Sequence, residues 1–335
     1  MKSKITSGIR IVLFLAVGLF LFWLVYKDQP LDDIISALKD ANYFWIIVSL
    51  FLSLLSHISR AMRWNLLINP LGYKPRLINT FFAVMVMYLS NLAIPRSGEI
   101  ARCSIIKKYE KVPLTQSLGT VVVERIFDFI MLFILLLLVL FSQMGVVIEF
   151  IQNNPEVEQK VSSLLQLKYL LIASFAFILF IGSAWFFRRT FKESSIYKKL
   201  KELIMSFVSG LDTVRKMDRK WQFIAHTVFI WVMYFLMIYV TFWSFEFTKH
   251  LSLIAGLTVF VMASFGMVAP SPGGIGTWHI MAIETLVIYG VNRYPDANAF
   301  AFAAHGAMTL FLITAGVISL ALLPVVNNKH EQKKG

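Results

Sequence analysis

Long apolar stretches alternate with short polar segments along the whole chain. They cover about 11–26, 43–59, 77–94, 114–142, 168–187, 221–247, 252–269, 274–290 and 298–323. An α-helix rises about 1.5 Å per residue and a hydrocarbon core is about 30 Å thick, so several stretches are long enough to cross a membrane. The pattern predicts an all-α polytopic membrane protein, with residues 1–335 as one integral membrane domain. The first stretch follows a basic end and lacks a small-residue cleavage site, which indicates an uncleaved anchor.

The distribution of basic residues restricts how the stretches cross. Segment 188–220 holds ten Lys or Arg, and it would lie opposite the basic N-terminus if 77–94 crossed fully. That arrangement violates the positive-inside rule. The conflict disappears if 77–94 turns at 95–98 and returns through 99–111. All basic segments then face the cytoplasm, and the acid-rich segments 27–42 and 143–167 face outward.

A second interruption supports this topology. Residues 270–275 repeat the pattern P-x-x-G-x-I of residues 95–100. Three full crossings separate the two breaks, so the second is inverted relative to the first. We therefore predict about six crossing helices and two inverted re-entrant hairpins, near 77–111 and 252–290, with both termini inside. Interrupted segments at matching positions of inverted halves mark transport sites, although Pro and Gly are also common wherever membrane helices turn.

Composition excludes several classes of protein. Hydrophobic residues make up 58% and charged residues 15%, against about 25% charged in soluble proteins. A soluble enzyme, a disordered chain and a disulfide scaffold do not fit. The net charge of +13 belongs to membrane loops rather than to a nucleic-acid surface. The single cysteine, Cys103, indicates a small buried thiol, and no motif for a cofactor, a metal or soluble catalysis is present, so we expect no catalytic residue.

Three ionisable residues lie deep inside the stretch 114–142. Glu124, Arg125 and Asp128 are 10 to 14 positions from its start. A charge at that depth costs at least about 2.5 kcal/mol unless it is paired or hydrated, so these side chains must face protein. Arg96 and Glu99, at matching depth, are candidate partners. The group forms an ion-pair clamp between helices, a polar path for a charged lipid headgroup, or a proton-coupled carboxylate.

The two breaks supply the other candidate binding residues. A helix beginning near Ser97 and Gly98 would point free N–H groups at an anion such as phosphate, and Arg96 would add a full charge. At the second break the glycines permit close backbone approach, or simply a turn. Its candidate residues are Gly273, Gly274, Gly276, Thr277, His279 and Glu284, a carboxylate with no neighbouring cation in the sequence. We interpret His226 and His305 as helix-packing residues.

Two basic segments are expected at the membrane surface. Residues 58–67 read as a short interfacial helix whose Arg60, Arg63 and Trp64 meet lipid headgroups. The loop 188–220 either recruits anionic headgroups or only sets topology.

Together these segments resemble the lysylphosphatidylglycerol synthase transmembrane-region family, whose members are described as flippase-like membrane proteins. The resemblance rests on Arg60–Trp64, Asn91–Glu99, Val123–Asp128 and Pro272–Gly276, and extends over about residues 9–323. In the best-known relatives this region is fused to a cytosolic domain that transfers lysine to phosphatidylglycerol, and the membrane region moves the product across the bilayer.

The resemblance implies a translocase in the inner (cytoplasmic) membrane, acting on lipids with phosphate headgroups. The chain ends at Gly335 without room for the synthase domain, so lysyltransferase activity is not expected and a separate lipid-modifying synthase is a possible partner. The substrate is left open among anionic or aminoacylated phospholipids and polyprenyl-phosphate lipids. Two alternatives remain: a membrane-embedded transferase or its accessory subunit, with Glu124 or Asp128 as general base, and a non-catalytic scaffold.

Overall fold

The computed structural model describes residues 36–145 and 213–332 without position 270, together with positions 148, 159, 162 and 210. The chain divides into two compact units, one formed by 1–139 with 216–335 and the other by 140–215. The account below concerns the first unit. The predicted stretches 11–26 and 168–187, most of the acid-rich segment 143–167 and most of the basic loop 188–220 lie outside the described residues.

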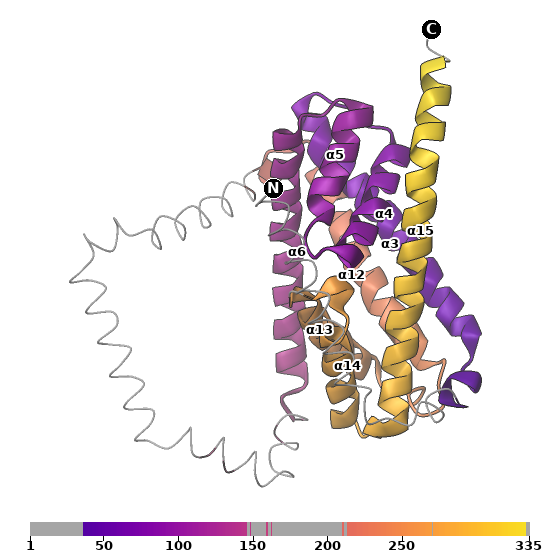
Figure 1. The fold of residues 1–335 in the computed structure, drawn as a ribbon. Coiled ribbons are helices and arrows are strands. Elements are labelled where there is room, and N and C mark those ends of the chain that lie inside the picture. The colour runs from indigo at the N-terminus through magenta and orange to yellow at the C-terminus, as the bar shows by residue number, and fades with distance from the viewer. Residues whose placement is uncertain are drawn as a thin grey trace, which may run out of the picture. The chain divides into compact units, whose positions relative to one another are not determined.

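The described residues are helical, as the apolar pattern predicts. Four of the described helices are long and apolar enough to cross a membrane: α3 (Tyr43–Ile68), α6 (Leu114–Ser142), α12 (Lys220–Phe242) and α15 (Asn298–Gln332) (Figure 1). Four shorter helices form two hairpins: α4 (Leu77–Ala93) with α5 (Gly98–Glu110), and α13 (Leu253–Val268) with α14 (Thr277–Ile288). Short turns lie at η1 (Asn69–Leu71), η2 (Pro272–Gly274) and η3 (Arg293–Ala297).

Helices α3 and α12 pack against each other in antiparallel directions. The side chain of Asn42 caps α3 by accepting from the N–H of Phe44 at 3.1 Å, and its own N–H donates to the carbonyl of Ser244, just beyond the end of α12, at 2.8 Å. Farther along, Ser59 hydrogen-bonds His226 at 2.8 Å. The end of α3 and the start of α12 therefore lie at the same end of the molecule, which we call the basic end.

The first hairpin opens toward the basic end. Arg76, at the start of α4, donates to Glu110, the last residue of α5, at 3.2 Å. Its tip is held by Asn91, whose side-chain oxygen accepts from the N–H of Gly98 at 2.8 Å. A Cβ at Gly98 would overlap the carbonyl oxygen of Met87, so only glycine allows the two helices this close approach.

The second hairpin opens toward the opposite end. Tyr289, just past α14, donates its hydroxyl to Thr258, early in α13, at 2.9 Å. At the tip, Thr277 donates to the carbonyl of Gly266 at 2.7 Å.

The tips of the two hairpins meet. A Cβ at Gly273, in the turn of the second hairpin, would overlap the side chain of Leu92, in the last turn of α4. Helix α15 contacts both hairpins: His305 hydrogen-bonds the carbonyl of Gly273 at 2.9 Å, and Asn327 donates to Asn79 near the start of α4 at 3.0 Å. Within the described residues, the two hairpins therefore run in opposite directions with their tips in contact.

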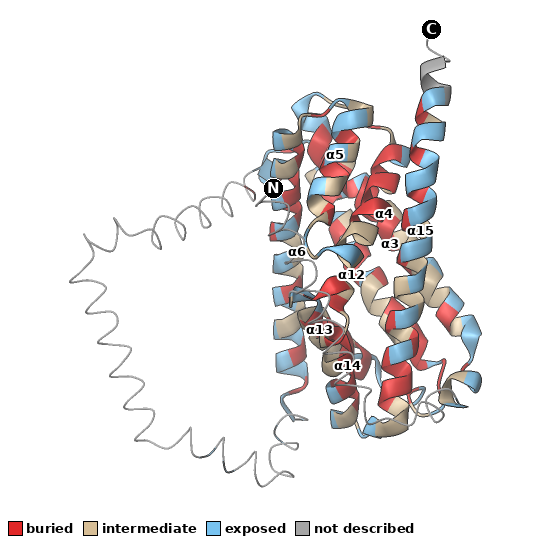
Figure 2. Ribbon diagram, viewed as in Figure 1, coloured by how far each residue is buried: buried red, intermediate tan, exposed pale blue. Residues whose placement is uncertain are grey.

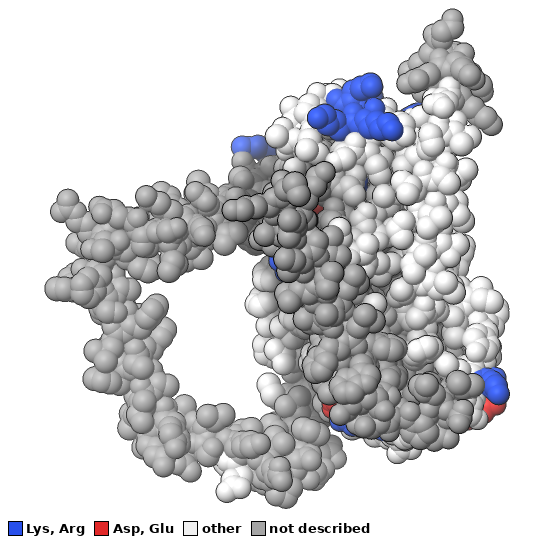
Figure 3. Space-filling view, in the orientation of Figure 1, with Lys and Arg blue, Asp and Glu red and all other residues white. Residues whose placement is uncertain are grey.

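The outer faces of the long helices are apolar. Phe129 and Phe133 on α6 and Leu310 on α15 are 62%, 50% and 66% exposed. Figure 2 colours parts of the outer sides of α6 and α15 as exposed. Figure 3 shows uncharged atoms along the flank of α15 and basic side chains gathered where α5 ends. Apolar flanks between polar ends are what a lipid environment requires. The chain is a multi-pass membrane protein.

Candidate functional site

A cluster of charged side chains lies buried between α3, α5 and α6, which we call the arginine cluster. It comprises Arg60 and Arg63 of α3, Arg102 of α5, and Glu124 and Asp128 of α6. The side chains of Arg63, Arg102 and Glu124 are each no more than 1% exposed. Charges this deeply buried persist only where opposite charges and hydrogen bonds surround them.

Glu124 is the centre of the arginine cluster. Its Oε1 accepts from Nη2 of Arg63 at 2.9 Å and lies 3.5 Å from Nε of Arg60. Its Oε2 accepts from Nη2 of Arg102 at 2.6 Å. One carboxylate therefore joins three guanidinium groups from two different helices, and it locks the returning helix of the first hairpin against α3 and α6.

Asp128 lies one helical turn farther along and links the cluster to its more exposed rim. Its Oδ2 accepts from Nη2 of Arg60 at 2.6 Å, and its Oδ1 lies 2.8 Å from Nη2 of Arg63 as an ion pair. Nη1 of Arg125 lies 3.8 Å from the same carboxylate, and Nη2 of Arg125 donates to Glu99 at 2.5 Å. Exposure rises outward, from 13% for Asp128 to 22% for Glu99 and 45% for Arg125.

Uncharged groups complete the surroundings. Arg60 donates to the hydroxyl of Tyr88 at 2.5 Å, which is 3.1 Å from the hydroxyl of Tyr234. Arg63 donates to Thr227 at 3.2 Å. The guanidinium of Arg102 stacks 4.4 Å above the ring of Trp64, a cation–π geometry. The sequence patterns did not single out Arg102, Tyr88, Tyr234 or Thr227.

The structure corrects the prediction for Arg60, Arg63 and Trp64. They do not form a separate interfacial helix, because α3 continues without a break to Ile68 and all three side chains are buried. Their spacing puts them on one helical face, and that face points at Glu124 and Asp128 instead of at lipid headgroups. The basic residues that pair with Glu124 are thus these arginines and Arg102, and the expected partner Arg96 is replaced in that role.

The first break matches its prediction in outline. Helix α5 begins at Gly98, and Arg96 is an exposed residue in the left-handed region, with φ of 65°. The hydroxyl of Ser97 does not cap the helix, because it donates back to the carbonyls of Ser90 and Ile94 at 3.1 and 2.8 Å. Glu99 pairs with Arg125, so the predicted link between the hairpin and the charges of α6 exists.

The second break is closely packed. Gly273, Gly274 and Gly276 have φ of 57°, 78° and 82°, a region that side chains with a Cβ rarely adopt. His279 is buried, accepts from the N–H of Gly276 at 3.3 Å, and its ring lies 4.6 Å from that of His305. These contacts, like those of Thr277, close the turn. Both His226 and His305 make hydrogen bonds between helices, as interpreted from the sequence.

The surroundings of Glu284 differ from the predicted ones, because it is neither deeply buried nor without a cation. It is 47% exposed and its two oxygens accept from the two Nη atoms of Arg293 at 2.5 and 2.6 Å. The partner follows nine residues later, beyond the end of α14, so the sequence around Glu284 did not reveal it. It belongs to the open end of the second hairpin, away from the tip.

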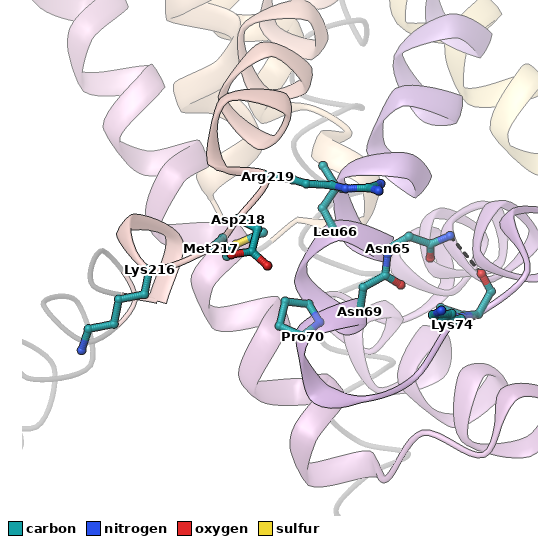
Figure 4. Close-up of a pocket in the computed structure, with 10 residues that line it drawn as sticks. Asn65, Leu66, Asn69, Pro70, Lys74, Lys216, Met217, Asp218 and Arg219 are labelled. Atoms are coloured by element: carbon teal, nitrogen blue, oxygen red, sulfur yellow. Dashed lines mark hydrogen bonds between the residues drawn. The ribbon is translucent and has the colours of Figure 1, made fainter.

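Within the residues that the structure describes, no group of three His, Cys, Asp or Glu side chains is placed to hold a metal ion. Cys103 is a buried free thiol, as expected. A pocket of about 580 Å³ lies at the basic end, between the end of α3 and the start of α12 (Figure 4). Its lining includes Lys74, Lys216, Asp218 and Arg219, and Figure 4 shows Lys216 pointing away from the other lining residues.

Comparison with known proteins gives partial matches of low identity. The chain is 29% identical over 131 residues to a UPF0104 membrane protein of Methanocaldococcus jannaschii, covering 38% of each protein. It is 26% identical over 130 residues to the glycosyltransferase AglD of Haloferax volcanii, covering 38% of this chain and 20% of that protein. The matches thus span well under half of either relative. No solved structure matches the chain.

The family model described as the lysylphosphatidylglycerol synthase transmembrane region matches residues 11–316. This range contains both hairpins, the arginine cluster and helices α3, α6 and α12. It also contains α15 as far as residue 316. The chain therefore belongs to the lysylphosphatidylglycerol synthase transmembrane-region family.

Proposed function

We propose that this protein is a lipid translocase that moves a lipid with a phosphate headgroup between the two leaflets of the membrane. The candidate lipids are anionic or aminoacylated phospholipids and polyprenyl-phosphate lipids, and the membrane is the cytoplasmic one. The observation that carries the proposal is the contact between the tips of two oppositely directed hairpins, at Leu92 and Gly273.

Broken helices whose ends meet inside the membrane are the usual way in which transporters build a site that is reachable from either side. Helices α4 and α5 have 17 and 13 residues, and α13 and α14 have 16 and 12. At about 1.5 Å per residue none of these four reaches across 30 Å of hydrocarbon. In this proposal they enter as re-entrant hairpins, one from each side.

Polar groups beside the tips support movement of a charged headgroup. Tyr88, one turn before Leu92, joins the first hairpin to Arg60 of the arginine cluster. Arg96 lies exposed at the turn, two residues before the start of α5, where the helix dipole also favours an anion. We expect Arg96 to make the first contact with a lipid phosphate, and Glu99, Arg125 and Asp128 to line the path beyond it.

Substitution of Arg96 tests this role. Purified Arg96→Ala protein, reconstituted in liposomes with labelled lipids, should lose translocation while unfolding at the wild-type temperature, because Arg96 is exposed. Lys107→Ala is the matched control, since it removes an exposed cation from α5, the helix that follows Arg96, at a position farther along the hairpin. Wild-type rates in a folded Arg96→Ala protein would contradict the role.

A transferase, or an accessory subunit of one, is the second candidate. The similarity to the glycosyltransferase AglD favours it, although the match covers 20% of that protein. Glu124 is poorly placed as a general base, because Arg63 and Arg102 occupy its two oxygens. Formation of a modified lipid by the purified chain, with no movement of lipid between leaflets, would favour this alternative.

A further inference from the structure

The pocket at the basic end lies apart from the arginine cluster and has no part in the proposed lipid path. It has a volume of about 580 Å³ and lies between the end of α3 and the start of α12 (Figure 4). Sites that bind small organic molecules have volumes of about 300–1,000 Å³. The pocket is thus large enough to hold such a molecule.

The lining of this pocket lies outside the apolar stretches of the chain. One wall comes from residues 65–75, which follow the stretch 43–59, and the other from residues 216–219, which precede the stretch 221–247. The positive-inside rule predicts that the basic end faces the cytoplasm. A ligand of this pocket would therefore arrive from water on that side and not from the hydrocarbon core.

Both walls of the pocket are fixed by the fold. In the first wall, Asn65 donates to the carbonyl of Pro75 at 3.1 Å and accepts from the hydroxyl of Thr80 at 2.7 Å. These bonds hold the connection between α3 and α4. In the second wall, Met217 is buried three residues before the start of α12. The pocket is therefore part of the folded structure.

Two cations line the pocket without a counter-charge. Lys74 and Arg219 are exposed, and neither forms an ion pair with another described residue. Asp218 also lines the pocket, whereas Lys216 points away from the other lining residues (Figure 4). Two positive charges against one negative charge favour an anion. No side chain caps the start of α12, and the free N–H groups there act in the same direction.

The rest of the lining is largely apolar and includes Leu66, Pro70, Pro75 and Met217. Bare phosphate would leave this apolar surface in contact with water, whereas an organic group attached to the anion would cover it. An arginine fork donates in pairs to phosphate oxygens, and a lysine binds phosphate as a point charge. The lining thus combines groups for a phosphate with a surface for the organic part that carries it.

We propose that this pocket binds a soluble phosphate ester, whose phosphate pairs with Arg219 and Lys74 and whose organic part contacts the apolar lining. The ligand would join the α3–α4 connection to the start of α12. Because it binds only the folded protein, it should also raise the unfolding temperature. This site does not depend on the proposed translocase function.

Equilibrium binding to the detergent-purified full chain tests the proposal. The probes are ADP and glucose-6-phosphate, with adenosine and glucose as their counterparts without phosphate. At about 0.15 M salt, at which distant charges are screened, at least one ester should bind and raise the unfolding temperature, and neither counterpart should. Arg219→Gln should weaken binding of that ester at least about tenfold, because a charge-assisted pair is lost. Asp218→Asn should tighten binding, because a repelling carboxylate is removed.

Lys216→Gln is the matched control, because Lys216 lies in the same wall but points away from the other lining residues (Figure 4). It should bind the ester as wild type does. Lys74→Gln removes the cation of the opposite wall and should also weaken binding. All four substituted side chains are exposed, so each variant should unfold at the wild-type temperature in the absence of ligand.

Three results would overturn the proposal: binding of neither ester by folded wild type, equal binding of an ester and its counterpart without phosphate, or unchanged binding by both Arg219→Gln and Lys74→Gln. Phosphatidylglycerol in mixed micelles distinguishes a lipid phosphate from a soluble one. If phosphatidylglycerol bound in a manner that depends on Arg219 and neither ester did, the pocket would hold a lipid headgroup and the assignment of a soluble ligand would be wrong.

Discussion

The two hairpins have the same form but are held together by different forces. The first is anchored by charge: Arg102 and Glu99 of α5 pair with Glu124 and Arg125 of α6. The second is anchored by close apolar packing: Gly266 of α13 lies against the backbone of Thr277 and Trp278 in α14, and Ala282 and Leu286 are fully buried. Charge thus holds the first hairpin in place, whereas close packing holds the second, and under the proposed function the first hairpin is the one that contacts a charged headgroup.

The largest expected effect comes from breaking the charge anchor. Glu124→Gln leaves Arg63 and Arg102 buried without their shared counter-charge, and loss of one partner from a buried ion pair typically costs about 3–5 kcal/mol. Glu284→Gln is the matched control in the second hairpin, where the pair with Arg293 is about half exposed and worth less than about 1 kcal/mol. Thermal unfolding in detergent compares them, and equal shifts would contradict the contrast.

The two hairpins and the buried charges of α6 could be predicted from the sequence. The ion-pair partners of those charges could not, for a physical reason. Turn residues such as Pro95 and Gly273 revealed both hairpins, and the buried charges of α6 revealed that a site exists. The prediction of the ion-pair partners of Glu124 and Asp128 was wrong. Arg60 and Arg63 are 61 or more positions away in sequence, and only packing of the helices brings them together. Arg102 was missed because it lies in α5, whose many polar residues resemble a surface helix.

Glycine contacts give the next largest effect and probe both hairpins alike. In Gly98→Ala the new methyl group overlaps the carbonyl of Met87, and in Gly266→Ala it lies 2.7 Å from the carbonyl of Thr277. Overpacking of this kind typically costs about 1–3 kcal/mol. Gly119→Ala in α6 meets open space and should be neutral or stabilising by up to about 1 kcal/mol. Equal stability of all three variants in unfolding measurements would mean that the helices of each hairpin do not approach each other this closely.

The meeting of the two tips is testable by a double-mutant cycle. Gly273→Ala should destabilise the protein, because φ is 57° and the methyl group overlaps Leu92. In the Leu92→Ala background that overlap is gone, so the cost should fall, with a coupling energy of about 1 kcal/mol. Additive effects in chemical or thermal unfolding would mean that the tips do not touch.

The smallest expected effects are those of single hydrogen bonds. Trp64→Phe removes the indole N–H that donates to Thr120 at 2.8 Å in a fully buried position beneath Arg102, and it should cost about 1 kcal/mol. Tyr289→Phe removes the partly buried bond to Thr258 in the second hairpin and should cost about 0.5 kcal/mol. Unfolding of the two variants is measured side by side. A larger loss of stability in Tyr289→Phe than in Trp64→Phe would contradict the assignment of the stronger polar anchor to the first hairpin.

The central claim is that this protein moves a phosphate-containing lipid across the membrane, and a leaflet-resolved assay in proteoliposomes tests it most directly. Purified protein is reconstituted with labelled phosphatidylglycerol, lysylphosphatidylglycerol or a polyprenyl phosphate, and the label in the outer leaflet is followed over time against protein-free vesicles. The account predicts that at least one of these lipids equilibrates faster with protein than without it. Folded protein that accelerates none of them would contradict it.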